Sequence, residues 1–283
     1  MTHAHDTAAA ATLSTQHVTL RAGTRILLDA FTQTFRAGEI WCVAGPNGAG
    51  KTTLLSTLAG LRPASAGHVE LDGRRLADWP PLPLARRRAL MPQSAHDAFS
   101  ASVLDIVMLN RFPHLGGWGW ERDTDRAAAQ AALERLGLGG FAARDVLSLS
   151  GGERQRVALA AVLCQGAPLL LLDEPLSHLD LHHQIDCLEA LVAWTQEPRR
   201  CVLFSCHDLN LARRFATHAL LLDGAGGAGG ACAGPVREVL TPESTSRAFG
   251  YPLILIRDGE HEALIPAPRM RHESHADHDV ASG

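Results

Sequence analysis

Long hydrophobic runs and aromatic residues are both scarce in this sequence. Only 5% of its 283 residues are Phe, Trp or Tyr, whereas 46% are hydrophobic, so we expect a core of aliphatic side chains. The densest apolar stretch, Pro168–Leu172, is well short of the roughly 18 residues that a membrane-crossing helix needs. The amino terminus lacks the basic and apolar segments of a secretory signal. We therefore expect one or two globular domains and no segment that crosses a membrane.

Cysteine pairs in metal-binding or redox spacing are missing as well. None of the six cysteines stands in a Cys-x-x-Cys pattern, and the chain is too long to be a small disulfide-stapled scaffold. Reduced thiols in a cytosolic protein are the simpler interpretation. The formal net charge of −4 gives no reason to expect nucleic acid as a partner.

Lysine is nearly absent. Of the 26 basic residues, Lys51 is the single lysine and the others are arginine. Arginine spreads its charge over a planar fork, whereas lysine carries a compact ammonium on a thin stem. A chain that uses lysine once is therefore expected to need a point charge at that position.

The order of the expected elements is that of an α/β protein. The run Leu169–Leu172 has no polar alternation, which is typical of a parallel strand covered on both faces. The expected strands include 41–44, 169–172, 201–205 and 219–222, and they alternate with expected helices such as 51–59, 182–194 and 208–217.

A glycine-rich turn between an expected strand and an expected helix matches the phosphate-binding pattern G-x-x-x-x-G-K-[ST]. Its glycines let backbone N–H groups turn inward around phosphate oxygens, and the start of the helix adds a favourable dipole. Lys51 would reach the β- and γ-phosphates of ATP, and the Thr52 hydroxyl would be a ligand of Mg²⁺. The nucleotide-binding residues expected here are Gly45, Pro46, Asn47, Gly48, Ala49, Gly50, Lys51, Thr52 and Thr53.

Two acidic residues follow the apolar strand Leu169–Leu172. Asp173, at the carboxyl end of the strand, suits a water-mediated contact to Mg²⁺, and Glu174 can polarise an attacking water as a general base. Two acidic residues in this place could also mark the N-terminus of a helix. Because they follow a phosphate-binding loop along the chain, the catalytic interpretation is favoured.

A second glycine-containing helix start lies at Leu149–Glu153. Ser150 and Glu153 match the S-x-x-E capping box, and Gly151 and Gly152 beside the helix start add an anion-binding surface. The segment resembles the LSGGQ signature of the ATP-binding cassette (ABC) family, and the resemblance extends over about residues 13–250. It implies that Ser150 and Gly152, with Gly151 between them, contact the γ-phosphate of ATP bound by the opposite subunit of a dimer.

The same resemblance implies roles for three weaker signals. Gln93 looks like the glutamine that senses Mg²⁺ and communicates with a membrane partner. Asp180 closes a segment similar to the family's D-loop, in which His178 replaces the usual Ala or Asn. His207 looks like the switch histidine that contacts the γ-phosphate, so Glu174 and His207 are the expected catalytic residues. The expected Mg²⁺ ligands are Thr52, Gln93 and Asp173.

The implied fold is an α/β P-loop NTPase (RecA-like) core with a small antiparallel β-subdomain and an inserted helical subdomain. Core and β-subdomain would take residues 13–93 and 159–250, and the helical subdomain residues 94–158. Residues 1–12 would be a disordered tail, and residues 251–283 a hairpin around Asp258-Gly259 followed by a His-rich tail. The tail histidines could bind metal, although a solvated tail is the favoured interpretation.

One part of the family's pattern is missing. Its members usually stack adenine on an aromatic residue upstream of the phosphate-binding loop, and Ala22 stands at that position. Arg21 or Arg25 could stack on the base instead.

Among ABC proteins, the pattern resembles the ATPases of iron-siderophore, haem and cobalamin importers. A single cassette without a coiled-coil insertion or zinc module favours a transporter over translation or DNA-repair ATPases. The resemblance implies the ATP-hydrolysing subunit of a bacterial importer for an iron-siderophore or cobalamin. A haem importer, another ABC importer or exporter, and a non-transport ABC ATPase are the alternatives. The matching segments are Asn110–His114, Asp180–Gln184, Ser205–Asn210 and Arg237–Glu243.

The implied partners are a second copy in an ATP-sandwich dimer, integral-membrane permease subunits and, indirectly, a periplasmic or lipoprotein substrate-binding protein. The chain would then lie peripherally on the cytoplasmic face of the inner membrane. We expect the permease to dock in a groove between Gln93 and the helix that begins near Ser102, with apolar contacts from Val103, Ile106 and Val107. The alternative is that these three side chains belong to the core.

Overall fold

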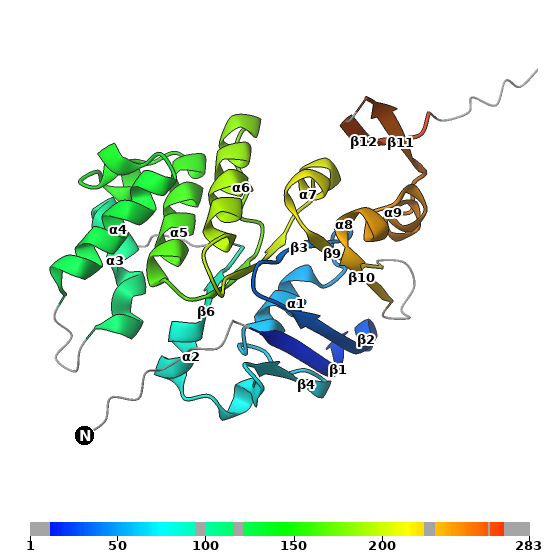
Figure 1. The fold of residues 1–283 in the computed structure, drawn as a ribbon, viewed down its shortest axis with the longest axis horizontal. Coiled ribbons are helices and arrows are strands. Elements are labelled where there is room, and N and C mark those ends of the chain that lie inside the picture. Colours follow the sequence, from blue (N-terminus) through cyan, green and yellow to red (C-terminus); the bar gives the residue numbers. More distant parts are fainter. Residues whose placement is uncertain (1–11, 94–99, 116–120, 224–229, 260, 269–283) are drawn as a thin grey trace, which may run out of the picture.

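The computed structural model describes residues 12–93, 100–115, 121–223, 230–259 and 261–268. In Figure 1, helices α3, α4 and α5 gather on one side, strands β1, β2 and β4 on the other, and the hairpin β11–β12 lies at the far end beyond α9. The expected tails, with their histidines, fall almost entirely outside the described residues.

A six-stranded sheet of the described residues forms the centre of the fold, in the order β10-β9-β3-β8-β7-β6. All neighbouring strands are parallel except β10 and β9. Every residue of β3, β7 and β8 is buried, which explains their uninterrupted apolar sequences. The expected α/β class with a parallel sheet is confirmed. The strands are β3 (Ile40–Ala44), β6 (Arg88–Met91), β7 (Leu169–Leu172), β8 (Cys201–Ser205), β9 (His218–Leu222) and β10 (Ala231–Pro235).

A smaller antiparallel sheet, in the order β2-β1-β4-β5, covers one side of helix α1. Apolar residues of α1, such as Leu54 and Leu58, pack in one core cluster with Phe35 and Trp41. The chain in β2 passes through Ala30 at a φ of 44° with a shift of register, so it forms one bulged strand. The elements are β1 (Leu13–Ala22), β2 (Arg25–Phe35), α1 (Lys51–Leu58), β4 (Ala66–Leu71) and β5 (Arg74–Arg75).

The middle of the chain is helical, as its sequence predicts. Helix α5 runs without a break through position 158, where the sequence placed the end of the helical subdomain. The α helices here are α2 (Pro81–Arg87), α3 (Val103–Met108), α4 (Asp123–Arg135) and α5 (Gly151–Gln165), and the 3-10 helices are η1 (Leu76–Asp78), η2 (Leu109–His114), η3 (Gly139–Phe141) and η4 (Val146–Ser148).

Two of the three residues expected to touch a permease are core residues. Val103 and Val107 are both 0% exposed within the helical cluster, so that part of the docking prediction is wrong. Both lie on the face of α3 that packs against other helices, whereas Ile106 is only half-buried. An apolar period of three to four residues locates a buried face but does not tell a core from a docking site.

The remaining elements close the main sheet and extend it. Residues 253–258 and 261–266 pair across Asp258-Gly259, so the expected hairpin is confirmed. In the described part of the chain, no helix is both long and apolar enough to cross a bilayer. The elements are α6 (Leu181–Thr195), α7 (Leu209–Phe215), α8 (Val236–Val239), α9 (Pro242–Phe249), β11 (Leu253–Asp258) and β12 (His261–Pro266).

The cysteines behave as apolar core residues. All six are free thiols, and five of them are buried. Burial raises the pKa of the Cys187 thiol to about 12 and that of the Cys206 thiol to about 11. These two thiols are therefore protonated at neutral pH.

Candidate functional site

The expected phosphate-binding and catalytic residues meet at one edge of the main sheet. Strand β8 lies between β3 and β7, and all three strands are parallel. The glycine-rich loop follows β3, Asp173 and Glu174 follow β7, and His207 follows β8. The carboxyl ends of neighbouring parallel strands are where α/β proteins bind their ligands.

The phosphate-binding loop needs glycine at two positions for space and conformation. Gly45 has a φ of 147°, and a Cβ atom there would lie 2.8 Å from the carbonyl oxygen of Leu222. Gly50 is the N-cap of α1 at a φ of 104°, in the left-handed region that disfavours other residues. The loop therefore packs closely against the end of β9. The N-terminus of α1 follows the loop directly, where its backbone N–H groups can bind an anion.

Lys51 is folded back into this loop. Its side chain is 6% exposed, and Nζ donates hydrogen bonds to the carbonyl oxygens of Gly45 at 2.8 Å and Pro46 at 3.2 Å. Burial lowers the pKa of Lys51, and the carboxylates of Glu174 and Asp173 oppose that shift. The ammonium is thus held beside the loop and the two acids that an entering phosphate would meet.

A buried serine holds the two acidic residues in place. Ser205 Oγ donates to Asp173 Oδ1 at 2.7 Å and accepts from the backbone N–H of Glu174, also at 2.7 Å. Asp173 is 2% exposed and Ser205 1%. Ser205 is not among the site residues predicted from the sequence, where its only signal is its place two residues before His207 at the end of a strand.

Glu174 and His207 are joined directly. Glu174 Oε1 and His207 Nε2 lie 2.8 Å apart, and both side chains are partly open to solvent. The two expected catalytic residues are therefore brought together, and the ring fixes where the carboxylate points.

A cavity of about 530 Å³ lies over this cluster. Its lining contains most of the residues expected to bind nucleotide from this side. Ala22, which stands where the family's aromatic residue is missing, is also part of the lining. The lining residues are Ala22, Leu27, Asn47, Gly48, Gly50, Lys51, Thr52, Thr53, Gln93, Glu174 and His207. Neither Arg21 nor Arg25 is among them.

The signature segment lines a different cavity, of about 600 Å³. Ser150, Gly151, Gly152 and Asp180 all face it, and none of its lining residues belongs to the first cavity. Within one chain, the structure therefore separates the expected nucleotide-binding residues into two groups.

The local geometry of the signature segment is the predicted capping box. Ser150 Oγ accepts from the N–H of Glu153 at 3.2 Å, and Glu153 Oε2 accepts from the N–H of Ser150 at 2.7 Å. A Cβ atom on Gly152 would lie 3.0 Å from the carbonyl oxygen of His178, so the helix start and the D-loop segment are in close contact. Asp180 caps α6 by accepting from the N–H of His183, which lowers the pKa of Asp180.

Oxygen donors that suit Mg²⁺ lie in the first cavity and beside it. Thr52 and Gln93 line the cavity and offer a hydroxyl and an amide oxygen, whereas the carboxylate of Asp173 is buried next to Glu174 and is not part of the lining. Mg²⁺ prefers oxygen ligands. In the parts of the chain that the structure describes, no group of three or more His, Cys, Asp or Glu residues could hold a metal alone.

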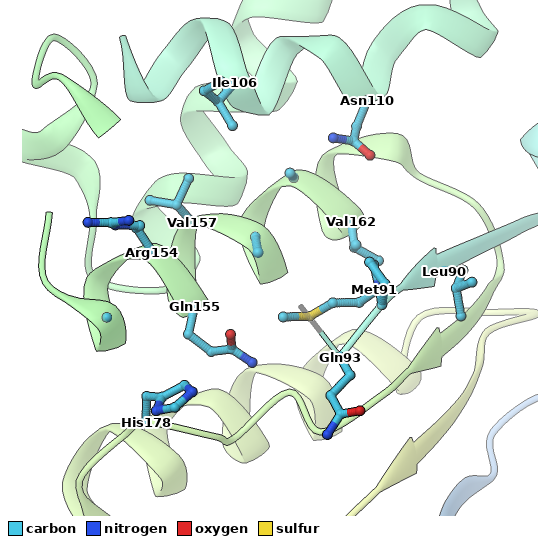
Figure 2. A pocket seen from close by; sticks show the side chains of 14 residues that line it. Leu90, Met91, Gln93, Ile106, Asn110, Arg154, Gln155, Val157, Val162 and His178 are labelled. Atoms are coloured by element: carbon cyan, nitrogen blue, oxygen red, sulfur yellow. The ribbon is translucent and has the colours of Figure 1, made fainter. Parts of the chain in front are cut away.

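A third cavity, of about 360 Å³, lies between the sheet and the helical segment. Figure 2 shows Leu90 and Met91 on one side of it and Ile106 and Asn110 on another, with side chains of α5 between them. Gln93 lines both this cavity and the first one. It therefore connects the surface beside the helices with the expected nucleotide site.

The chain is similar to proteins of known class. The model of the ABC transporter family matches residues 28–177. The hemin import ATP-binding protein of Streptomyces coelicolor is 43% identical over 250 residues, which cover 87% of this chain and 86% of the relative. The iron(3+)-hydroxamate import ATP-binding protein of Bacillus subtilis is 35% identical, with 87% and 90% coverage. The cobalamin import ATP-binding protein of Halobacterium salinarum is 44% identical, with 87% and 61% coverage.

Solved structures agree on the fold. An inward-facing metal-chelate type ABC transporter matches with a TM-score of 0.79 and 28% identity, over 92% of this chain and 98% of that one. A dimeric bacterial ABC transporter cassette matches with a TM-score of 0.69 and 24% identity, over 80% of this chain and 99% of that one. The expected P-loop NTPase architecture is confirmed.

Proposed function

Because the chain belongs to the ABC transporter family of ATPases, we propose that two copies of it close on two ATP molecules and power an importer. The observation that carries this is the separation of the two groups of residues. Lys51 and Glu174 line one cavity, and Ser150 and Gly152 line another on the same chain. A second copy supplies the group that each site lacks.

In the first cavity, the backbone N–H groups of the glycine-rich loop and the Lys51 ammonium bind the phosphates. Lys51 exchanges its contacts with Gly45 and Pro46 for phosphate oxygens, which are better partners for a buried cation than neutral carbonyls. Adenine packs over Ala22, where the small side chain leaves room for the base.

Thr52, Gln93 and Asp173 hold Mg²⁺, which neutralises phosphate charge when it is bound. Ser205 orients the carboxylate of Asp173 and the backbone of Glu174. Glu174 accepts the proton of the attacking water as general base. His207, held against Glu174, contacts the γ-phosphate. Ser150 and Gly152 of the second copy, at the N-terminus of α5, bind the same phosphate from the other side.

The permease docks at the third cavity. Ile106 and Asn110 line it, and Leu109 and Phe112 on the adjoining 3-10 helix are 64% and 70% exposed. Gln93 reaches from this surface to the nucleotide cavity, so docking and Mg²⁺ binding act on one side chain. In this proposal the chain lies peripherally on the cytoplasmic face of the membrane, and a substrate-binding protein acts on the other side.

The transported substrate is a metal chelate, with an iron-siderophore or cobalamin as first choice. The relatives named for iron(3+)-hydroxamate and cobalamin import support this choice. Haem is the second candidate, supported by the 43% identical hemin import protein.

Dimer formation by two variants tests the composite site. Glu174→Gln keeps the shape of the side chain but removes the base, so we expect ATP and Mg²⁺ to trap a dimer on a sizing column. Adding Ser150→Asp preserves the helix cap but repels phosphate, and should abolish the dimer with unchanged ATP affinity. A Glu174→Gln chain that binds ATP tightly and stays monomeric would contradict the proposal.

A further inference from the structure

The backbone of Glu174 is held in an unusual conformation. Its φ is 51°, in the left-handed region that residues with a side chain rarely adopt. Such a conformation persists only where surrounding contacts determine it. The contacts that hold this residue therefore decide where its carboxylate lies.

Contacts from three elements hold Glu174. Its N–H donates to Oγ of Ser205, the last residue of β8, and its carboxylate meets His207, which follows that strand. Its carbonyl oxygen accepts from Gln155 Nε2 at 2.9 Å and from the N–H of Ser177 at 3.2 Å. The Ser177 contact is part of the local turn, so among the described residues Gln155 supplies the only long-range hydrogen bond to this carbonyl.

Gln155 belongs to the helix that begins at the signature. It is half-buried in the second turn of α5, one turn after Ser150 and Glu153 form the capping box. Figure 2 shows its side chain extending from α5 toward the end of the cavity where Gln93 and His178 lie. One rigid helical turn thus joins the cap at Ser150 to the main chain of Glu174.

From these contacts, and resting on the proposed function, we infer that Gln155 is a positioning residue for ATP hydrolysis. It fixes the left-handed turn at Glu174 and so sets the carboxylate against the attacking water. Because the same helix start binds the phosphate in the partner's site, occupancy of one site is transmitted through Gln155 to the base of the other. Gln155 itself touches neither nucleotide nor water.

Gln155→Glu is the main test, because it keeps the size of the side chain but replaces its donor by an acceptor that repels the Glu174 carbonyl. We expect kcat to fall by about tenfold or more, with KM for ATP within about twofold of the wild type. Gln155→Leu, which removes the donor without adding charge, should show the same division between kcat and KM.

Gln165→Glu is the matched control on the same helix. Gln165 Nε2 also donates to backbone carbonyls, those of Ala85 at 2.6 Å and Arg88 at 3.0 Å, but far along α5 from the site. Gln165→Glu should lower the melting temperature at least as much as Gln155→Glu and leave kcat unchanged. Equal kcat losses in both variants would overturn the inference.

The ATP-dependent dimer of the Glu174→Gln variant shows whether Gln155→Glu misplaces Glu174 or instead disrupts the signature segment at Ser150. In a Glu174→Gln background, Gln155→Glu should leave ATP-dependent dimerisation intact, because it acts only through the base that is already absent. Loss of the dimer, or a wild-type kcat in Gln155→Glu, would overturn the inference while the proposed function stands. A wild-type chain that does not hydrolyse ATP would overturn both.

Discussion

The single lysine shows how one residue type is suited to one place. Lys51 sits 6% exposed with its ammonium between the carbonyl oxygens of Gly45 and Pro46. A planar guanidinium presents its donors over a wider fork than a compact ammonium does. The compact charge that the composition suggested is therefore the charge that the loop accommodates.

Substitution of Lys51 should weaken ATP binding, whereas substitution of Glu174 should slow ATP hydrolysis. Lys51→Ala removes the buried cation nearest the phosphates, so ATP affinity should fall by at least about tenfold. Glu174→Gln should retain the wild-type affinity and lose turnover by about 10²-fold or more. Titration with a fluorescent ATP analogue and a phosphate-release assay measure the two quantities. An equal loss of ATP affinity in the two variants would show that the assigned roles are wrong.

Sequence motifs identify the residues expected to bind nucleotide, but not the residues that hold Glu174 in position. The residues from Gly45 to Thr52 could be assigned from spacing because the loop is made by one continuous segment. Ser205 and Gln155 could not, because each acts on Glu174 through a contact that joins distant parts of the chain. A serine at a strand end and a glutamine inside a helix carry no pattern of their own.

At the scale of elements, helix α3 shows what apolar periodicity leaves open. Val103 and Val107 have the spacing of one helix face, and that face packs into the helical core. The exposed apolar side chains lie one element later, at Leu109 and Phe112 in η2. Only packing against α4 and α5 decides which apolar residues are covered.

Aspartate substitutions should separate the core face from the docking face. Val103→Asp places a charge in the core and should cost about 2–5 kcal/mol of unfolding free energy, with early melting. Phe112→Asp should melt like the wild type and hydrolyse ATP normally, but lose coupling to uptake with a co-expressed permease. Leu61→Asp, at a 65% exposed leucine outside the cavity, is the control. Normal uptake with Phe112→Asp would place the docking surface elsewhere.

For the whole molecule, the arrangement of the cavities is the basis of the proposed dimer. The phosphate-binding cavity and the signature cavity share no lining residue, and Gln93 joins the former to the cavity beside the helices. In the proposed function, a second copy closes these sites and a permease receives the motion.

Transport measurements test the whole assembly. In cells that express this chain with its permease, we expect uptake of labelled iron-siderophore or cobalamin, with haem as the second candidate. Lys51→Ala should reduce that uptake to the background level, because the step that drives it needs bound ATP. Uptake of an amino acid through an unrelated carrier is the control. Uptake of none of the three chelates would contradict the substrate class.

The sequence by itself determined what depends on a few neighbouring residues. The glycine-rich loop, the capping box at Ser150, the Asp258-Gly259 turn and the parallel-type strand Leu169–Leu172 follow from local dihedral preferences and hydrogen bonds. These features were sufficient to indicate the α/β class and the phosphate chemistry.

Only the tertiary structure decided what depends on the register of distant segments. Strand β8 lies between β3 and β7, and this order places Ser205 and His207 against the two acids that follow β7. Packing of the helical segment buried Val103 and Val107 and left the signature cavity apart from the nucleotide cavity. Such contacts arise from side-chain packing across the whole core, which no local pattern encodes.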